Sequence, residues 1–134
     1  MDINECEEKG FIREITPNTN QILSLKEMAQ IKHEEVLNQK LTERNISVYF
    51  SLYYDVIREL LEAYCLKEGF KILNHDCLGE KMKELNSEFD FITFDRIRFL
   101  RNGVNYYGKQ IPYEQGTNLL EKMQKMYDWI LKNL

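Results

Sequence analysis

SVYFSLYYDVIRELLEAYCLKEGF, residues 47 to 70, is the most heavily apolar segment of the chain. Apolar side chains recur in it at steps of three and four residues, which is the spacing of one face of an α-helix. The predicted inner face carries Val48, Leu52, Val56, Leu60 and Ala63. Because further apolar side chains widen this face, we expect the stretch to form the central helix of the core, ended by Gly69.

A second helix is predicted before this stretch. Apolar residues from Ile22 through Met28 to Leu37 recur at roughly helical spacing. Thr16-Pro17 is the expected start, because proline is favoured at the first helical position after a capping residue. Residues 1–15 show no period, so we expect them to form a partly ordered arm.

Three more helices are expected after the central one. Asn74 can cap a short helix, and Ser87-Glu88-Phe89-Asp90 matches the capping-box pattern that opens the next. The inward side chains of that next helix are predicted to be Phe94, Ile97, Leu100, Val104 and Tyr107. Gly108 is its expected end, and a last amphipathic helix follows Ile111-Pro112 and runs to the C-terminus.

The length and the amino-acid composition of the chain agree with this helical pattern. The chain has 134 residues, the size of one domain with one core. It holds six glycines and two prolines, so turns are few, and no stretch alternates apolar and polar residues as a strand does. We therefore expect no sheet and predict an all-α fold: a single up-and-down bundle of four to five helices over residues 16–134.

Charge and cysteine content bear on function and location. The net charge of −4 gives no global basic field of the kind that drives strong non-specific nucleic-acid binding, although it leaves room for a local basic face. Cys6, Cys65 and Cys77 are widely spaced without a CxxC pair, so we expect neither a disulfide framework nor a zinc site, and a reducing cytoplasm as the location. No apolar run is long enough to cross a membrane, and the acidic start is unlike a signal peptide.

RNGVNYY, residues 101 to 107, is unusually polar for the end of a packing helix. Arg98, Arg101 and Asn105 share one side of the predicted helix because they are three and four residues apart, and Asn102 and Tyr106 lie one turn apart beside them. Together these guanidinium, amide and phenol groups suit phosphate oxygens. Gly103 costs a helix ~1 kcal/mol relative to alanine, which suggests the close approach of another backbone or a ligand.

The order of these features resembles the HEPN domain family of small helical bundles. The resemblance covers about residues 17 to 131 and rests on the central stretch, on KILNHDCLGEKM after it, on FDRIRFLRNGVNYYGKQI, and on the closing amphipathic helix. It implies a dimer with a cleft that binds RNA or nucleotide. It also implies a role as a metal-independent ribonuclease or as part of a toxin–antitoxin or nucleotidyltransferase pair.

The ribonuclease motif of that family is an arginine, a polar residue that is commonly asparagine, and a histidine after about four to six further positions. Arg101 and Asn102 match its first half, but Tyr106 stands where the histidine falls, and Tyr107 and Gly108 occupy the longer spacings. A phenol with an ordinary pKa near ~10 is ionised in about one molecule per thousand at pH 7, so it is a poor general base. We therefore expect phosphate binding through Arg98, Arg101, Asn102 and Asn105, with Tyr106 in the place of the base and little or no cleavage.

Two other hypotheses stay open. One is a working ribonuclease despite Tyr106, and the other is a purely structural dimeric module in which Arg101 pairs with acids such as Glu59 or Glu62. The two histidines are not assigned to catalysis: we expect His33 to be a solvated surface residue and His75 to be a loop or capping residue. No cofactor motif and no set of metal ligands is predicted.

Overall fold

The computed structural model describes all 134 residues, most of which are helical. The α-helices are α1 (Ile3–Glu8), α2 (Thr19–Leu37), α3 (Ile46–Lys67), α4 (Leu78–Leu85), α5 (Phe91–Tyr107) and α6 (Tyr113–Asn133). A short 3-10 helix, η1 (His75–Cys77), leads into α4, and two strands, β1 (Ile12–Glu14) and β2 (Phe70–Ile72), form an antiparallel pair. None of the helices combines the length and the apolar composition that crossing a membrane requires.

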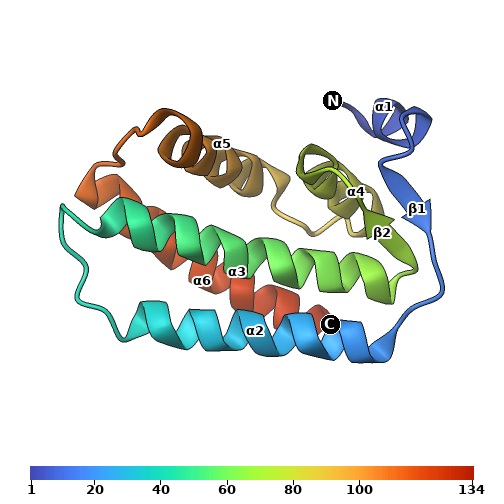
Figure 1. Cartoon of the computed structure of the whole chain (residues 1–134), viewed down its shortest axis with the longest axis horizontal. Helices are drawn as coiled ribbons and strands as arrows, with labels where there is room; N and C mark the ends of the chain where they lie inside the picture. Colours follow the sequence, from blue (N-terminus) through green and yellow to red (C-terminus); the bar gives the residue numbers. More distant parts are fainter.

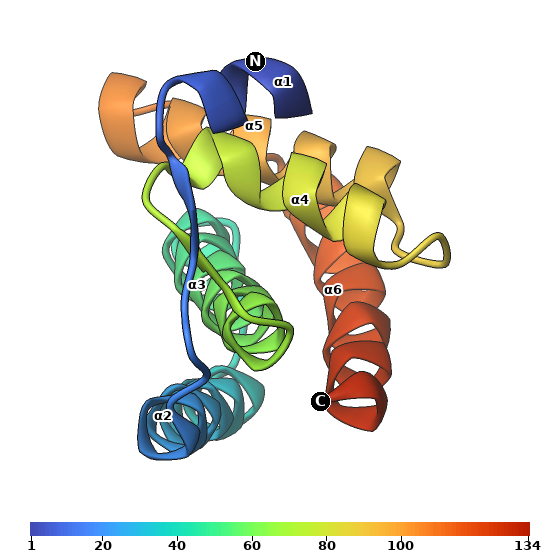
Figure 2. The same cartoon turned by 90° about the vertical axis from the view of Figure 1, so that its right-hand side faces the viewer.

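The helices lie in three layers (Figures 1 and 2). α3 and α6 form the middle layer, α2 packs on the outer side of α3, and α4 and α5 cover the opposite side. Along the long axis in Figure 1, α2, α3, α5 and α6 run in alternating directions, so consecutive long helices follow an up-and-down order. The predicted helical class is therefore confirmed. The predicted number of four to five helices is too low, because the chain also forms α1 within the segment expected to be an arm.

α3 is the centre of this arrangement, as the sequence predicts. Its contacts with α2, α4, α5, α6 and β2 bury it on most sides, and large side chains such as Phe50, Tyr53 and Leu61 are completely covered. Val48, however, is 62% exposed, which contradicts its predicted inward position. A four-residue step advances about 40° around a helix, so a row that begins outside at Val48 reaches the buried side only near Val56.

The N-terminal segment departs most from expectation. Instead of a partly ordered arm, residues 1–15 contain α1 and β1, and β1 pairs with β2 so that Ile12 lies opposite Ile72. The prediction of no sheet is wrong because each strand has three residues, too few for an alternating pattern to be visible. The prediction of no disulfide is also wrong: Cys6 and Cys77, separated by 71 positions in sequence, are bonded and tie α1 to η1.

The helix ends follow local chemistry with small shifts. The cap of α2 is Asn18, two residues after Thr16, and its side chain accepts a hydrogen bond from the backbone of Gln21. The cap of α5 is Asp90, the last residue of the predicted capping box, not Ser87. Gly69 and Gly108 adopt left-handed backbone angles, with φ of 93° and 64°, and follow the ends of α3 and α5 as predicted.

His33 is not the solvated surface residue that its charged neighbours suggest. Its Nδ1 lies 2.8 Å from the hydroxyl of Tyr53, and its ring stacks on Tyr127 with 3.9 Å between ring centroids. Burial lowers the pKa of His33, while the nearby Asp128 and Glu34 act in the opposite direction. The side chain therefore joins α2 to both helices of the middle layer.

Reduction of the disulfide between Cys6 and Cys77 is expected to lower the free energy of unfolding by about 2–4 kcal/mol, because the bond restricts a long loop of the unfolded chain. Urea unfolding of the purified protein with and without a thiol reductant measures this difference. The double variant Cys6→Ser/Cys77→Ser is the control and should not respond to reductant. Detection of three free thiols in the unfolded, air-equilibrated protein by alkylation and mass spectrometry would contradict the prediction.

Candidate functional site

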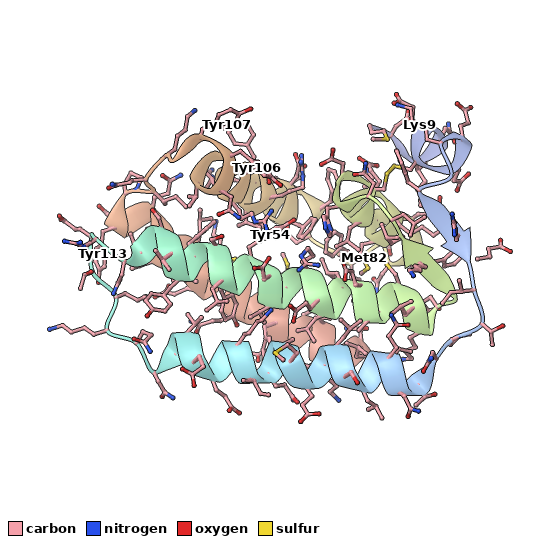
Figure 3. The ribbon with its side chains drawn as sticks, in the orientation of Figure 1. Lys9, Tyr54, Met82, Tyr106, Tyr107 and Tyr113 are labelled. Atoms are coloured by element: carbon pink, nitrogen blue, oxygen red, sulfur yellow. A yellow bond between two sulfur atoms is a disulfide. The ribbon has the colours of Figure 1, made fainter.

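Four of the five predicted site residues line one cavity. Arg98, Arg101, Asn102 and Tyr106 of α5 border a space of about 420 Å³, which we call the Arg101 cavity. Its remaining walls are Tyr54 of α3 and the turn from Leu73 to Asp76. Figure 3 shows Tyr54 between α3 and α5, with Tyr106 on the last turns of α5. The cavity thus lies where α5 passes η1.

Asn105, the fifth predicted residue, does not line this cavity. Its side-chain oxygen accepts a hydrogen bond of 2.9 Å from the hydroxyl of Ser51 on α3. Asn105 therefore links the exposed end of α5 to α3. Its predicted role in holding phosphate has no geometric support beyond its position on the same side of the helix as Arg98 and Arg101.

Arg98 is held by carboxylates of the same chain. Its Nη1 donates to Asp76 of η1 at 3.0 Å, and its Nη2 and Nε donate to Asp95 of α5 at 2.8 and 3.2 Å. Because two carboxylates share this guanidinium, little donor capacity is left for a ligand. Arg98 connects α5 to the turn that forms the opposite wall of the cavity.

Arg101 is bound much more loosely. Of its nitrogens only Nη2 donates, to Asp55 of α3, over a long 3.5 Å, and the guanidinium lies 5.2 Å from the ring centre of Tyr54. Its Nε is buried without a hydrogen-bond partner, which is unusual because an unpaired buried donor costs about 1–3 kcal/mol. Arg101 therefore retains donors that the chain does not satisfy.

The electrostatics around the cavity are nearly balanced. The guanidinium groups are those of Arg58, Arg98 and Arg101, and the carboxylates within ion-pair distance of them are those of Asp55, Asp76, Asp95 and Glu62. Burial raises the pKa of Tyr54 to about 12, although Arg101 and the two other arginines act against this shift. An incoming anion therefore meets no uncompensated positive field, and the Tyr54 hydroxyl keeps its proton at neutral pH.

His75 is the residue of this site that sequence reasoning missed. It is the first residue of η1, it lines the Arg101 cavity, and its Nδ1 lies 3.5 Å from Oε1 of Glu62 on α3. Asn74 caps η1 as predicted by accepting from the backbone of Asp76. No local pattern reveals the proximity of His75 to Arg101, because it depends on the packing of η1 against α3 and α5.

A second hollow lies on the outer side of α5 and holds about 400 Å³. We call it the aromatic cavity, and its lining includes Phe99, Asn102, Gly103, Tyr106 and Tyr107, together with the 109–112 segment and Gln115. Tyr107 was predicted to face inward but is 77% exposed at the edge of the molecule (Figure 3). The helix ends one residue later at Gly108, where the chain turns away from the core.

Comparison with known proteins assigns neither a family nor a function to the chain. No protein-family model, no curated protein and no solved structure matches the chain. No group of three or more His, Cys, Asp and Glu side chains is arranged to hold a metal ion. The chemistry of the site must therefore be argued from its own side chains.

Arg101→Met is expected to change the free energy of unfolding by less than about 1 kcal/mol. Asp55 keeps a second partner, because Nε of Arg58 lies 3.6 Å from the same carboxylate oxygen, and the substitution also removes the unpaired buried Nε. Arg98→Met is the comparison and should destabilise more, since it separates α5 from η1. Urea unfolding of both variants measures the effects. A loss above about 3 kcal/mol for Arg101→Met would identify Arg101 as a structural residue.

Proposed function

We propose that the chain is a HEPN-type nucleotide- or RNA-binding protein that holds a phosphate group in the Arg101 cavity and has weak or no ribonuclease activity. The observation behind the proposal is the loosely held guanidinium of Arg101, whose one contact with a carboxylate is 3.5 Å long and which borders an open cavity together with Asn102 and Tyr106. Planar guanidinium groups suit phosphate oxygens because two parallel N–H donors match two oxygens. The resemblance of RNGVNYY to the first half of the family motif supports the same residues.

Each site residue then has a defined task. Arg101 donates to the phosphate, and the amide of Asn102 orients it. Arg98, which Asp76 and Asp95 already hold, contributes charge and keeps η1 in place opposite Arg101. Because carboxylates nearly balance the arginines, we expect phosphate alone to bind weakly.

An active metal-independent endoribonuclease is the second candidate, and His75 is the observation that favours it. Tyr106 stands in the motif position of the base, but a phenol is a poor base at neutral pH. The imidazole of His75 lines the same cavity, and Oε1 of Glu62, which also accepts from Arg58, lies 3.5 Å from its Nδ1. Histidine is the side chain most often used as a general base near neutral pH. His75 would supply the group that the motif lacks.

The structural-module hypothesis is less well supported. It requires Arg101 to be saturated by carboxylates and the cavity to be closed, whereas Arg101 has one distant carboxylate partner and borders an open space. The acids named for that role pair within the chain, Glu59 with Lys32 and Glu62 with Arg58. Glu62 is thus already paired, and the second oxygen of Glu59, which has no partner, is buried and out of reach of an arginine of another copy.

Partners and location remain proposals. A homodimer and a nucleotidyltransferase or antitoxin partner rest on the resemblance alone. The cytoplasmic location is predicted in part from the expected absence of disulfides and in part from the lack of an apolar run or signal-peptide pattern. The bond between Cys6 and Cys77 removes the first of these arguments, because disulfides persist mainly in oxidising compartments.

Arg101→Met is expected to weaken binding of a short fluorescein-labelled single-stranded RNA at least about tenfold, because hydrogen bonds to charged groups contribute about 1.5–3 kcal/mol. Fluorescence anisotropy at fixed ionic strength measures the affinity. Arg96→Met is the matched control: Arg96 is an exposed arginine of the same helix and does not line the Arg101 cavity. Equal loss in both variants would show that binding reflects general charge and not this site.

Incubation of RNA with the protein in the presence of a metal chelator separates the two candidates. We expect binding without appreciable cleavage. Cleavage that is lost in both Arg101→Met and His75→Gln would instead establish the ribonuclease and reject the non-catalytic form of the proposal. Cleavage that survives in both variants would point to a contaminating nuclease.

A further inference from the structure

We infer that the aromatic cavity binds the base of a nucleotide whose phosphate is held in the Arg101 cavity. The inference rests on the proposed phosphate site and extends it, because it assigns a second, separate subsite to the base of the ligand.

The two cavities are neighbours along α5 and share two lining residues. Asn102 and Tyr106 line both of them, so these two side chains form the partition between the charged space on one side and the aromatic space on the other. Asn102 and Tyr106 lie one turn of helix apart, and in the inferred complex the sugar of the nucleotide passes between them. A ligand with an anionic end and a flat apolar end fits this order of groups.

The aromatic cavity has the chemistry of a base subsite. Phe99, Tyr106 and Tyr107 present their rings to solvent, with exposed fractions of 70%, 69% and 77%. Stacking of a base on such a ring contributes about 1–3 kcal/mol and occurs for every base, because each has a π-face. The amides of Asn102, Gln110 and Gln115 lie around the same space and can both donate to and accept from the edge of a base.

Gly103 supports a ligand on this face. It lies in the middle of α5 and lines the aromatic cavity, yet an added Cβ would meet only the side chain of Lys109, at an ordinary 3.5 Å. Packing within the chain therefore does not require glycine here. Gly116 is the contrast, because a Cβ there would come within 2.5 Å of the buried Ile46. Glycine destabilises a helix by ~1 kcal/mol relative to alanine. A ligand that lies against the helix backbone at position 103 would account for a glycine there.

A base accounts for this surface better than a second copy of α5. The lining is concave and contains three amides and Lys109 among its aromatic rings, which suits a small planar ligand. The charged Arg96 and Asp95 interrupt the apolar residues between Ile92 and Phe99 on the outer side of the helix. Because the charges around the Arg101 cavity are nearly balanced, the phosphate group alone contributes little affinity. Most of the affinity for a nucleotide must then come from contacts with its base and sugar.

The test compares adenosine 5′-monophosphate with ribose 5-phosphate by isothermal titration calorimetry. The two ligands share the phosphate and the sugar, so their difference reports the base. We expect the nucleotide to bind at least tenfold more tightly to the natural protein. Gly103→Leu should remove this difference by filling the cavity, while leaving the affinity for ribose 5-phosphate unchanged. Phe99→Ala should reduce the difference in the same direction.

Ser24→Leu, at an exposed position of α2, is the control for adding leucine to a helix surface and should change neither affinity.

Equal affinities of the two ligands, both lost in Arg101→Met, would overturn the base subsite and leave the phosphate site standing. A nucleotide preference that persists in Arg101→Met would reject the phosphate site while the base subsite stands. No binding of either ligand would overturn both. A dimer that Gly103→Leu converts to monomer in sedimentation velocity, without a nucleotide preference in the natural protein, would assign this face to a second copy.

Discussion

Burial of α3 on most of its sides is the constraint on which the rest of the structure depends. A helix covered on several sides needs a neighbour for each of them, and α2, α6 and the pair α4 and α5 supply these neighbours. Large side chains of α3, such as Phe50, Tyr54 and Ile57, have little or no surface accessible to solvent. The single buried cluster that results extends from Ala29 of α2 to Ile130 of α6, so α3 holds together layers that have few contacts of their own.

The same packing creates the candidate site. α5 lies on α3 through Phe94 and Ile97, and this places Arg101 above Asp55 and Tyr54 of α3. The chain then reaches the opposite wall through β2 and η1. The site is therefore built from one long helix, one central helix and one turn, and its charges are mostly satisfied inside the chain. Arg101 is the exception, because its Nε has no hydrogen-bond partner and its contact with Asp55 is long.

The N-terminal segment is ordered by contacts with residues that are distant in sequence, which its own local sequence does not predict. β1 has only three residues and would not be stable alone, but β2 and the bond from Cys6 to Cys77 hold it against the body. η1 thus receives support from α1 at Cys77 and contributes Asp76 and His75 to the site. The position of the cavity wall depends in this way on residues at the opposite end of the chain.

The helical class, the central place of α3, the glycines that follow α3 and α5, and the cluster of polar side chains on α5 could all be predicted from the sequence, because each depends on residue spacing within a few turns. The packing of distant elements was needed to show that Arg98 is satisfied while Arg101 is not, that His75 lines the same cavity, and that Tyr107 lies outside the core. These features depend on which elements meet in space. Helical periodicity specifies the faces of a helix but not the partners that those faces contact.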